Sequence, residues 1–200
     1  GLMIFIPFLL CFFYSNVLQE LDNLNFILAI SGCCFVIGLI DDIKNVAYRY
    51  KFIFLISVFY LFLYLDPNLQ IDKLYFSTLD RTYSLNSFGI HFTVLCLLLF
   101  TNALNLIDGV DGLCILVSII LFAWIVLFFK IFEFTNLLII LSLIYIFCLN
   151  IKKKIFLGDS GSLFIGSLIG LVLINSYNFT GLVSFIPVES IFIALMLPGF

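Results

Sequence analysis

Charged residues are scarce in this chain. Only 10% of its 200 residues are charged and 64% are hydrophobic, whereas about 25% are charged in an ordinary soluble domain. So little polar surface cannot cover a water-soluble globule. The apolar runs have the length of helices and do not alternate as strands do, which favours an all-α, polytopic helix bundle in a membrane over a β-barrel.

Other features that are rare or absent narrow the function. The six cysteines show neither metal-ligand nor disulfide spacing, so we interpret them as small buried apolar residues. The net charge is −3 and no basic stripe is present, so we expect no nucleic-acid partner. The chain begins inside one apolar run and ends directly after another. We therefore expect a single domain over residues 1–200 that is a fragment without its N- and C-terminal parts.

We count about eight apolar segments as candidate membrane spans. Several are shorter than the roughly 20 residues of a full crossing. The segments cover residues 1–14, 25–40, 52–65, 91–107, 113–129, 136–150, 160–175 and 185–198. The one long connection, 66–90, contains strand-forming residues and turn signals that predict a short hairpin on the outer face, within 70–90.

Basic residues are distributed unequally if the spans alternate in direction. Six of the nine fall on the side that carries the connections 41–51, 108–112 and 151–159. They are Lys44, Arg49, Lys51, Lys152, Lys153 and Lys154. The positive-inside rule places this side in the cytoplasm. All six can be explained as signals of topology, and we expect Lys44 and the three consecutive lysines to be the cations nearest to the acidic residues described next.

Three separate stretches bring acidic or amide side chains to this same side. In the first, Asp41 and Asp42 are adjacent at the end of a span. Such neighbours point about 100° apart on a helix, and their mutual repulsion suits a general base or a metal-linked carboxylate. A helix-end pair balanced by Lys44, Arg49 and Lys51 is the alternative interpretation.

In the second stretch, Asn102, Asn105, Asp108 and Asp111 recur every three residues after an apolar run. On a helix they would form one slanting stripe. Carboxylates at a helix C-terminus face the negative end of the helix dipole, so we expect a cation or a basic partner to offset them. A solvated helix end rich in turn-forming residues is the alternative.

In the third stretch, Gly158 frees the backbone before a helix that Asp159 or Ser160 would cap. A helix N-terminus favours anions such as phosphate, and the three preceding lysines add positive charge. An ordinary helix cap with positive-inside lysines is the alternative.

The three stretches, GLIDDIKN from Gly38, NALNLIDGVDGL from Asn102 and IFLGDSGSLFIG from Ile155, resemble the signature stretches of the polyprenyl-phosphate N-acetylhexosamine-1-phosphate transferases. Their order and separations are similar over essentially the whole chain. The resemblance implies that a UDP-sugar donates a sugar-1-phosphate to undecaprenyl phosphate with release of UMP, which initiates a lipid-linked cell-envelope glycan. It also implies Mg²⁺, or Mn²⁺, as cofactor and a multi-pass protein of the bacterial inner membrane with its active site on the cytoplasmic face. A homodimer is left open.

The resemblance assigns catalytic and metal-binding roles by position. It implies that Asp41 and Asp42 activate the polyprenyl phosphate, that Asp108 is a third essential acid, and that Asn105 and Asp159 hold the metal. The acceptor phosphate would then attack the β-phosphorus of the donor, and the metal would neutralise charge on the leaving UMP.

Substrate-binding roles are implied in the same way. Asp111 matches a position that reads the uracil edge, Phe156 one that stacks on the base, and Asn102 the leading amide of the second stretch, while we group Gly158 with these substrate-binding residues. Many members have an acid or lysine where this chain has Asn45, so the role of that position stays open.

Two alternative functions remain. One is the same chemistry on the muramyl-pentapeptide donor of peptidoglycan synthesis, because a late loop that distinguishes donors in the family has no counterpart here. The other is an ion-coupled transporter. Acids in transporters tend to lie near mid-depth in the membrane, whereas the acids here are expected at one interface, which disfavours transport.

Overall fold

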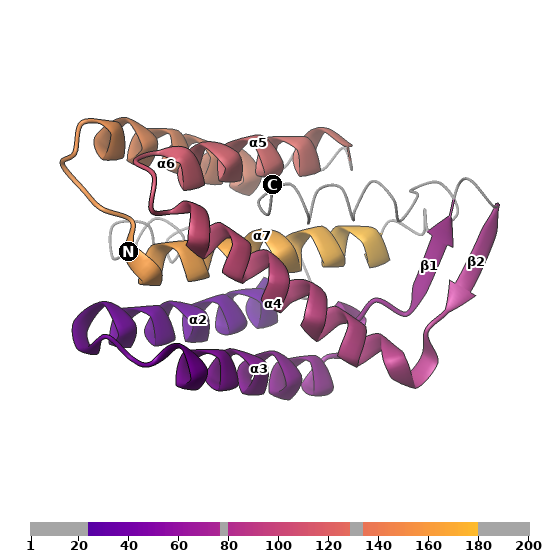
Figure 1. Cartoon of the computed structure of the whole chain (residues 1–200). Helices are drawn as coiled ribbons and strands as arrows, with labels where there is room; N and C mark the ends of the chain where they lie inside the picture. The colour runs from indigo at the N-terminus through magenta and orange to yellow at the C-terminus, as the bar shows by residue number, and fades with distance from the viewer. Residues whose placement is uncertain (1–23, 77–79, 129–133, 180–200) are drawn as a thin grey trace.

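The computed structural model describes residues 24–76, 80–128 and 134–179, which form six long helices and two short strands (Figure 1). The helices are α2 (Leu24–Lys44), α3 (Tyr48–Leu65), α4 (Gly89–Ile107), α5 (Leu113–Phe128), α6 (Phe134–Ile151) and α7 (Gly158–Phe179). The smaller elements are η1 (Pro67–Leu69), β1 (Lys73–Phe76), β2 (Arg81–Ser84) and η2 (Asn86–Phe88).

Six of the eight expected segments correspond to these helices, and the other two, 1–14 and 185–198, lie outside the described residues. Four described helices are long and apolar enough to cross a membrane, namely α2, α3, α4 and α7. Helices α5 and α6 are apolar but shorter. The chain is therefore a helical membrane protein, and the number of spans stays a prediction.

Helix α7 lies in the middle of the bundle. Figure 1 shows α2 and α3 on one side of it, α5 and α6 on the other, and α4 crossing it, and α7 packs against α2, α4 and α5. It is buried along almost its whole length, whereas α3 exposes large apolar side chains such as Ile53, Phe54 and Leu61. Outward-facing apolar side chains suit a hydrocarbon environment. The bundle therefore buries α7, which carries several polar residues, and directs apolar side chains toward lipid.

Small residues let α4 and α7 approach closely. A Cβ added to Gly166 would lie 3.0 Å from the Cα of Thr101, and one added to Gly170 would lie 2.9 Å from Cδ2 of Leu97. These contacts are four residues apart on each helix and run in opposite directions. This is the small-residue packing by which membrane helices associate, and it brings the end of α4 against the start of α7.

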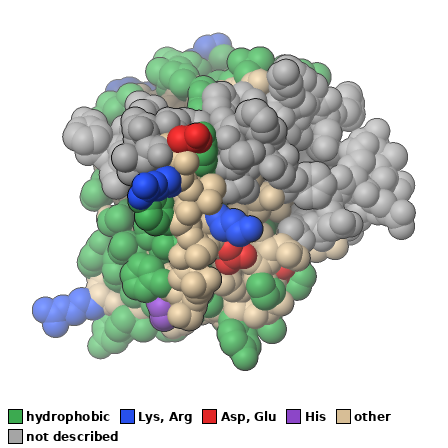
Figure 2. All heavy atoms as spheres, turned by 90° about the vertical axis from the view of Figure 1, so that its right-hand side faces the viewer, with side chains coloured by type: hydrophobic (Ala, Val, Ile, Leu, Met, Phe, Trp, Pro, Cys, Tyr) green, Lys and Arg blue, Asp and Glu red, His purple; other side chains and the backbone are tan. Residues whose placement is uncertain are grey.

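The two strands lie at the end of the bundle away from the three acidic stretches. Lys73 pairs with Ser84 and Phe76 with Arg81 in antiparallel register. The hydroxyl of Tyr177, on α7, donates to the carbonyl oxygen of Lys73 at 2.9 Å and so ties the strands to the bundle. Figure 2 views this end, where acidic and basic side chains are interspersed among apolar ones and no large patch of one sign is visible among the described atoms.

Candidate functional site

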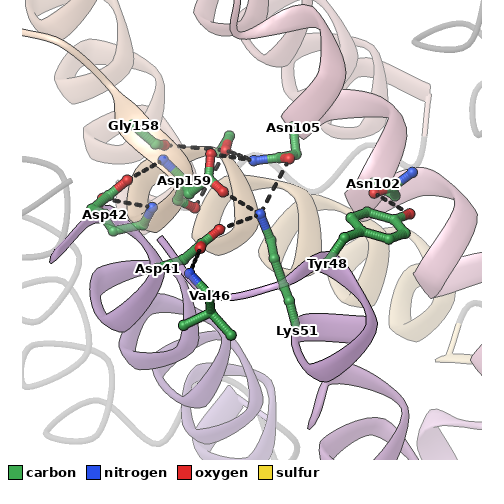
Figure 3. Close-up of polar contacts among 11 residues, drawn as sticks. Asp41, Asp42, Val46, Tyr48, Lys51, Asn102, Asn105, Gly158 and Asp159 are labelled. Carbon is green, nitrogen blue, oxygen red and sulfur yellow. Dashed lines mark hydrogen bonds and ion pairs between the residues drawn. The ribbon is translucent and has the colours of Figure 1, made fainter. Parts of the chain in front are cut away.

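The three acidic stretches meet at one end of the bundle, where α2 and α4 end and α7 begins (Figures 1 and 3). Each connection at this end contains a residue in the left-handed backbone region. These are Asn45 (φ 48°), Gly112 (φ 79°), Lys153 (φ 54°) and Gly158 (φ 69°). Such residues reverse the chain tightly. Asparagine tolerates this conformation well, so the position that Asn45 occupies has a structural role in ending α2.

Lys51, one of the three basic residues that the sequence offered as counter-charges for Asp41 and Asp42, occupies the centre of the site. Helix α3 begins at Tyr48, so Lys51 lies in its first turn and only 6% of the residue is exposed. Its Nζ donates to Asp41 Oδ2 at 2.9 Å, to Asp159 Oδ2, and to Asn105 Oδ1 at 3.5 Å (Figure 3). The expectation that Lys44 and Lys152–Lys154 are the nearest cations is therefore wrong, whereas the alternative in which Lys51 balances the aspartate pair is confirmed for Asp41.

Asp41 joins the end of α2 to the start of α3. Its Oδ1 accepts the backbone N–H of Val46 at 2.7 Å, and its Oδ2 accepts Lys51 Nζ. The first bond fixes the turn after α2 and the second compensates the charge. Asp41 is thus a carboxylate held at both oxygens by groups of its own chain.

Asp42 caps the N-terminus of α7 from another helix. Its Oδ1 accepts the backbone N–H of Asp159 at 2.8 Å and its Oδ2 accepts that of Ser160 at 3.1 Å. The prediction that Asp159 or Ser160 caps this helix is therefore wrong, and two of the N–H groups expected to attract phosphate are already paired. A Cβ on Gly158 would lie 3.0 Å from Asp42 Oδ2 at a left-handed φ of 69°, so this cap requires glycine.

Asn105 and Asp159, the predicted metal ligands, are in direct contact. Asn105 Nδ2 donates to Asp159 Oδ1 at 3.0 Å and to Ser162 Oγ at 2.8 Å. These bonds turn the amide oxygen of Asn105 toward Lys51. The structure therefore brings Asn105, Asp159 and Asp41 around one point, with Ser162 as a supporting residue that the sequence analysis missed.

The predicted stripe along α4 is only partly present. Asn102 and Asn105 lie on the helix, whereas Asp108 is its C-cap and Asp111 follows in the turn. Asn102 Oδ1 accepts the hydroxyl of Tyr48 at 3.2 Å, which ties α4 to α3. The helix ends before the four side chains can share one face.

The remaining predicted substrate-binding residues point to the surface. Phe156 is 72% exposed, and Asp111 pairs with Lys153 at 3.6 Å, both side chains being at least half exposed. Their surroundings leave room for a ligand, and their roles in donor binding stay predictions.

Asp108 is the acid in this region whose protonation is most perturbed. Burial, together with the negative charges of Asp159 and Asp42, raises its pKa to about 6, although the nearby backbone N–H of Gly158 opposes the shift. The ionised form of Asp108 is therefore destabilised in the folded protein.

Asp108→Asn is expected to raise the melting temperature at pH 8 without divalent metal, and to raise it less at pH 5, where folded Asp108 is still mostly protonated. The folded protein binds a proton at Asp108 more tightly than the unfolded chain does. The stability that this proton supplies is therefore lost as the pH rises from the unfolded value of 3.8 through about 6. Thermal unfolding in detergent at both pH values measures the effect. The exposed Asp111→Asn serves as control, and an equal effect of Asp108→Asn at both pH values would contradict the assignment.

Two sequence signals could have distinguished Lys51 from the other two basic residues offered as counter-charges for the aspartate pair. It lies directly before an almost wholly apolar run, and it follows the Asp41–Asp42 pair by about ten residues, which is enough for a tight turn back along the bundle. A lysine at such a boundary either extends its amine to water or pairs with an acid. Nothing local distinguishes these two outcomes.

The fold and the site together define a helical membrane protein with a cluster of acids and amides at one end of its bundle. Comparison with protein families matches residues 24–177 to the family described as glycosyl transferase family 4. The chain belongs to this family.

Several relatives are similar over most of the chain. A Bacillus subtilis (strain 168) protein, named probable undecaprenyl-phosphate N-acetylglucosaminyl 1-phosphate transferase, is 29% identical over 82% of this chain and 46% of its own length. Phospho-N-acetylmuramoyl-pentapeptide-transferases of Prochlorococcus marinus (strain MIT 9312) and Petrotoga mobilis (strain DSM 10674 / SJ95) are 30% and 31% identical, over 90% and 97% of this chain and 56% and 67% of their own lengths. The chain spans about half the length of the Bacillus subtilis and Prochlorococcus marinus proteins.

Proposed function

We propose that the full-length protein transfers a sugar-1-phosphate from a UDP-sugar to a polyprenyl phosphate and releases UMP. The observation that carries the proposal is the convergence of Asp41, Asn105 and Asp159 at one end of a membrane bundle, in a chain of this family. A lipid-borne acceptor and a water-soluble donor can meet only at such an interface. A transporter is disfavoured because the acids lie at helix ends and not at mid-depth.

The oxygen atoms at the centre of the site suit a hard divalent cation. Among the described residues no three His, Cys, Asp or Glu side chains form a metal-binding group. An amide oxygen must therefore complete the set, and Asn105 Oδ1 and the carboxylate of Asp159 already converge on one cation, Lys51. Carboxylate and amide oxygens are ligands of Mg²⁺. Asn105 and Asp159 would hold Mg²⁺ or Mn²⁺, which would neutralise charge on the donor pyrophosphate.

The other acids would bind and activate the acceptor. Asp41 and Asp42 each accept two hydrogen bonds, one on each oxygen, which leaves a lone pair on each oxygen for a proton from the acceptor phosphate. Asp108, with a pKa raised to about 6, is ionised near neutral pH and holds a proton more readily than an ordinary aspartate. Asp111 and Phe156 lie exposed, where a uracil base would have access.

The experiment that tests this function measures UMP release by the full-length protein in detergent with undecaprenyl phosphate and Mg²⁺. Donors to compare are UDP-N-acetylglucosamine, UDP-N-acetylmuramoyl-pentapeptide and other UDP-sugars, because the relatives carry names of both kinds. We propose an N-acetylhexosamine donor and a role in initiating a lipid-linked cell-envelope glycan, with the muramyl-pentapeptide donor as the alternative. Absence of UMP release with every donor would refute the transfer reaction.

Labelling of single cysteines is expected to place the site in the cytoplasm. Asp72 and Lys154 are exposed at opposite ends of the bundle, and the lysine bias puts position 154 inside. In a cysteine-free background, an impermeant thiol reagent applied to intact cells should label a cysteine at position 72, and should label position 154 only after permeabilisation. Labelling of both positions from the same side would contradict this topology.

A further inference from the structure

Lys51 lies where the oxygen atoms of the site converge, and each acceptor comes from a different helix. Asp41 belongs to α2, Asn105 to α4 and Asp159 to α7, while the lysine itself extends from α3 (Figure 3). An ammonium group has three donors, so these three bonds satisfy it completely. Its stem is buried and its charge faces two carboxylates. Lys51 is therefore the cation that holds four helix ends together in this structure.

The carboxylates need such a cation. Asp41 and Asp159 both direct an oxygen at the same Nζ atom, so without the ammonium two negative charges would face each other in a partly dry site. Like charges at that separation repel strongly when water is excluded. Lys51 thus preserves the arrangement of the very oxygen atoms that a metal would bind.

The same oxygen atoms cannot serve the ammonium and a divalent metal at once. A metal such as Mg²⁺ would coordinate these oxygen atoms directly, at about 2.0–2.1 Å, and would compete with the ammonium for them. Asp159 Oδ2 and Asn105 Oδ1 both point at Lys51 Nζ, so a metal on these two residues would lie beside the ammonium and repel it. Asp41 Oδ2, at 2.9 Å, can retain the lysine when the other two oxygens are withdrawn.

We propose that Lys51 is a built-in counter-ion which holds the site before metal arrives and which the metal displaces from Asp159 and Asn105. This inference rests on the proposed metal-binding role of those two residues. It makes Lys51 a positioning residue that opposes metal binding in the free protein. A purely structural tie would have the opposite consequence, since its loss would disorder the ligands and weaken metal binding.

Measuring Mn²⁺ binding to the full-length protein by electron paramagnetic resonance, without substrate, distinguishes a displaced counter-ion from a purely structural tie. Lys51→Met keeps the length of the side chain and removes the charge. It is expected to lower the Mn²⁺ dissociation constant by roughly tenfold or more, because the metal no longer displaces a cation. Lys153→Met, which removes an exposed lysine paired with Asp111, is the matched control and should leave the constant unchanged. Unchanged or weaker binding by Lys51→Met would overturn the proposal.

A second variant keeps the test decisive if Lys51→Met does not fold. Lys51→Arg retains a cation that grips carboxylates with a planar fork, so it should bind Mn²⁺ no more tightly than the unsubstituted protein. Tighter binding by this variant would overturn the proposal. A third readout is the gain in melting temperature on adding Mn²⁺, which should be larger for Lys51→Met than for the unsubstituted protein.

Failure of the inference can be distinguished from failure of the proposed metal site. If the unsubstituted protein binds Mn²⁺ and Asp159→Asn abolishes binding, the metal site stands and the Lys51 variants test the inference alone. If neither the unsubstituted protein nor Lys51→Met binds Mn²⁺ at millimolar concentration, both the metal site and the inference are refuted. UMP release tests the transfer reaction separately from either result.

Discussion

Asp159→Asn in the full-length protein is expected to lower the rate of UMP release by roughly 10²-fold or more, as loss of a group that stabilises the transition state does. Asp159 contacts both Asn105 and Lys51, so it lies at the only point among the described residues where three helices bring an amide, a carboxylate and an ammonium together. An asparagine there keeps the shape and loses the charge that balances Lys51 and that would hold the proposed metal. Initial rates at saturating donor and Mg²⁺ measure the effect.

The same variant should also be less stable than the unsubstituted protein. If Asp159 were the helix cap, its replacement by asparagine would change the stability little. The cap is Asp42, however, and Asp159 compensates the charge of the buried Lys51. Asp41 still pairs with Lys51, so we expect a loss of about 1–3 kcal/mol, less than for a buried charge left alone. Asp72→Asn, an exposed substitution of the same kind at the other end of the bundle, is the control. A near-normal rate for Asp159→Asn, or full activity in excess chelator, would remove Asp159 from the metal site.

Gly38→Ala is expected to destabilise the bundle and to abolish most activity although it touches no predicted site residue's side chain. The added Cβ would lie 2.5 Å from the carbonyl oxygen of Asp159 and from the Cα of Ser160, both backbone atoms that cannot rotate away. Helix α2 must then move from α7. Asp42 lies one helical turn beyond Gly38 on the same face, so this movement would break its two bonds to the start of α7.

The expected cost combines overpacking, about 1–3 kcal/mol, with loss of a helix cap, about 1 kcal/mol. The fraction of full-length protein that stays monodisperse after heating in detergent measures it. Gly109→Ala is the matched control for stability, because a Cβ at that position would come no closer than 3.8 Å to its neighbours and no positive φ is required. Equal melting temperatures for the two variants would show that α2 and α7 do not need this close approach.

Much of the architecture could be predicted from local patterns. Apolar runs of helix length predict α2 to α7, because a helix in lipid must satisfy its backbone internally and present apolar side chains outward. Gly112 and Gly158 mark helix ends correctly, whereas the role of Asn45 at the end of α2 was left open. Alternation of the runs then brings three distant stretches to one end of the bundle, and the structure confirms that they meet there.

The partners within the site could not be predicted in the same way. Asp41 and Asp42 are chemically identical neighbours, yet one compensates Lys51 and the other caps a helix more than a hundred residues later in the chain. A single stripe from Asn102 to Asp111 requires a helix that continues to Asp111. Helix α4 ends at Ile107, so Asp108 and Asp111 do not share a helix face with Asn102.

By itself the sequence determined that this is a helical membrane protein, which helices it forms and which end carries the acids, because hydropathy and backbone preference act over a few neighbouring residues. Only the tertiary structure decided that Lys51 is buried at the centre and that Asp42 belongs to the start of α7. Those outcomes depend on how closely α2, α4 and α7 approach, and this close approach requires the absence of a Cβ at Gly38, Gly166 and Gly170. The charge of a side chain follows from the residue type, but which group lies close enough to compensate it depends on the distances between the helices.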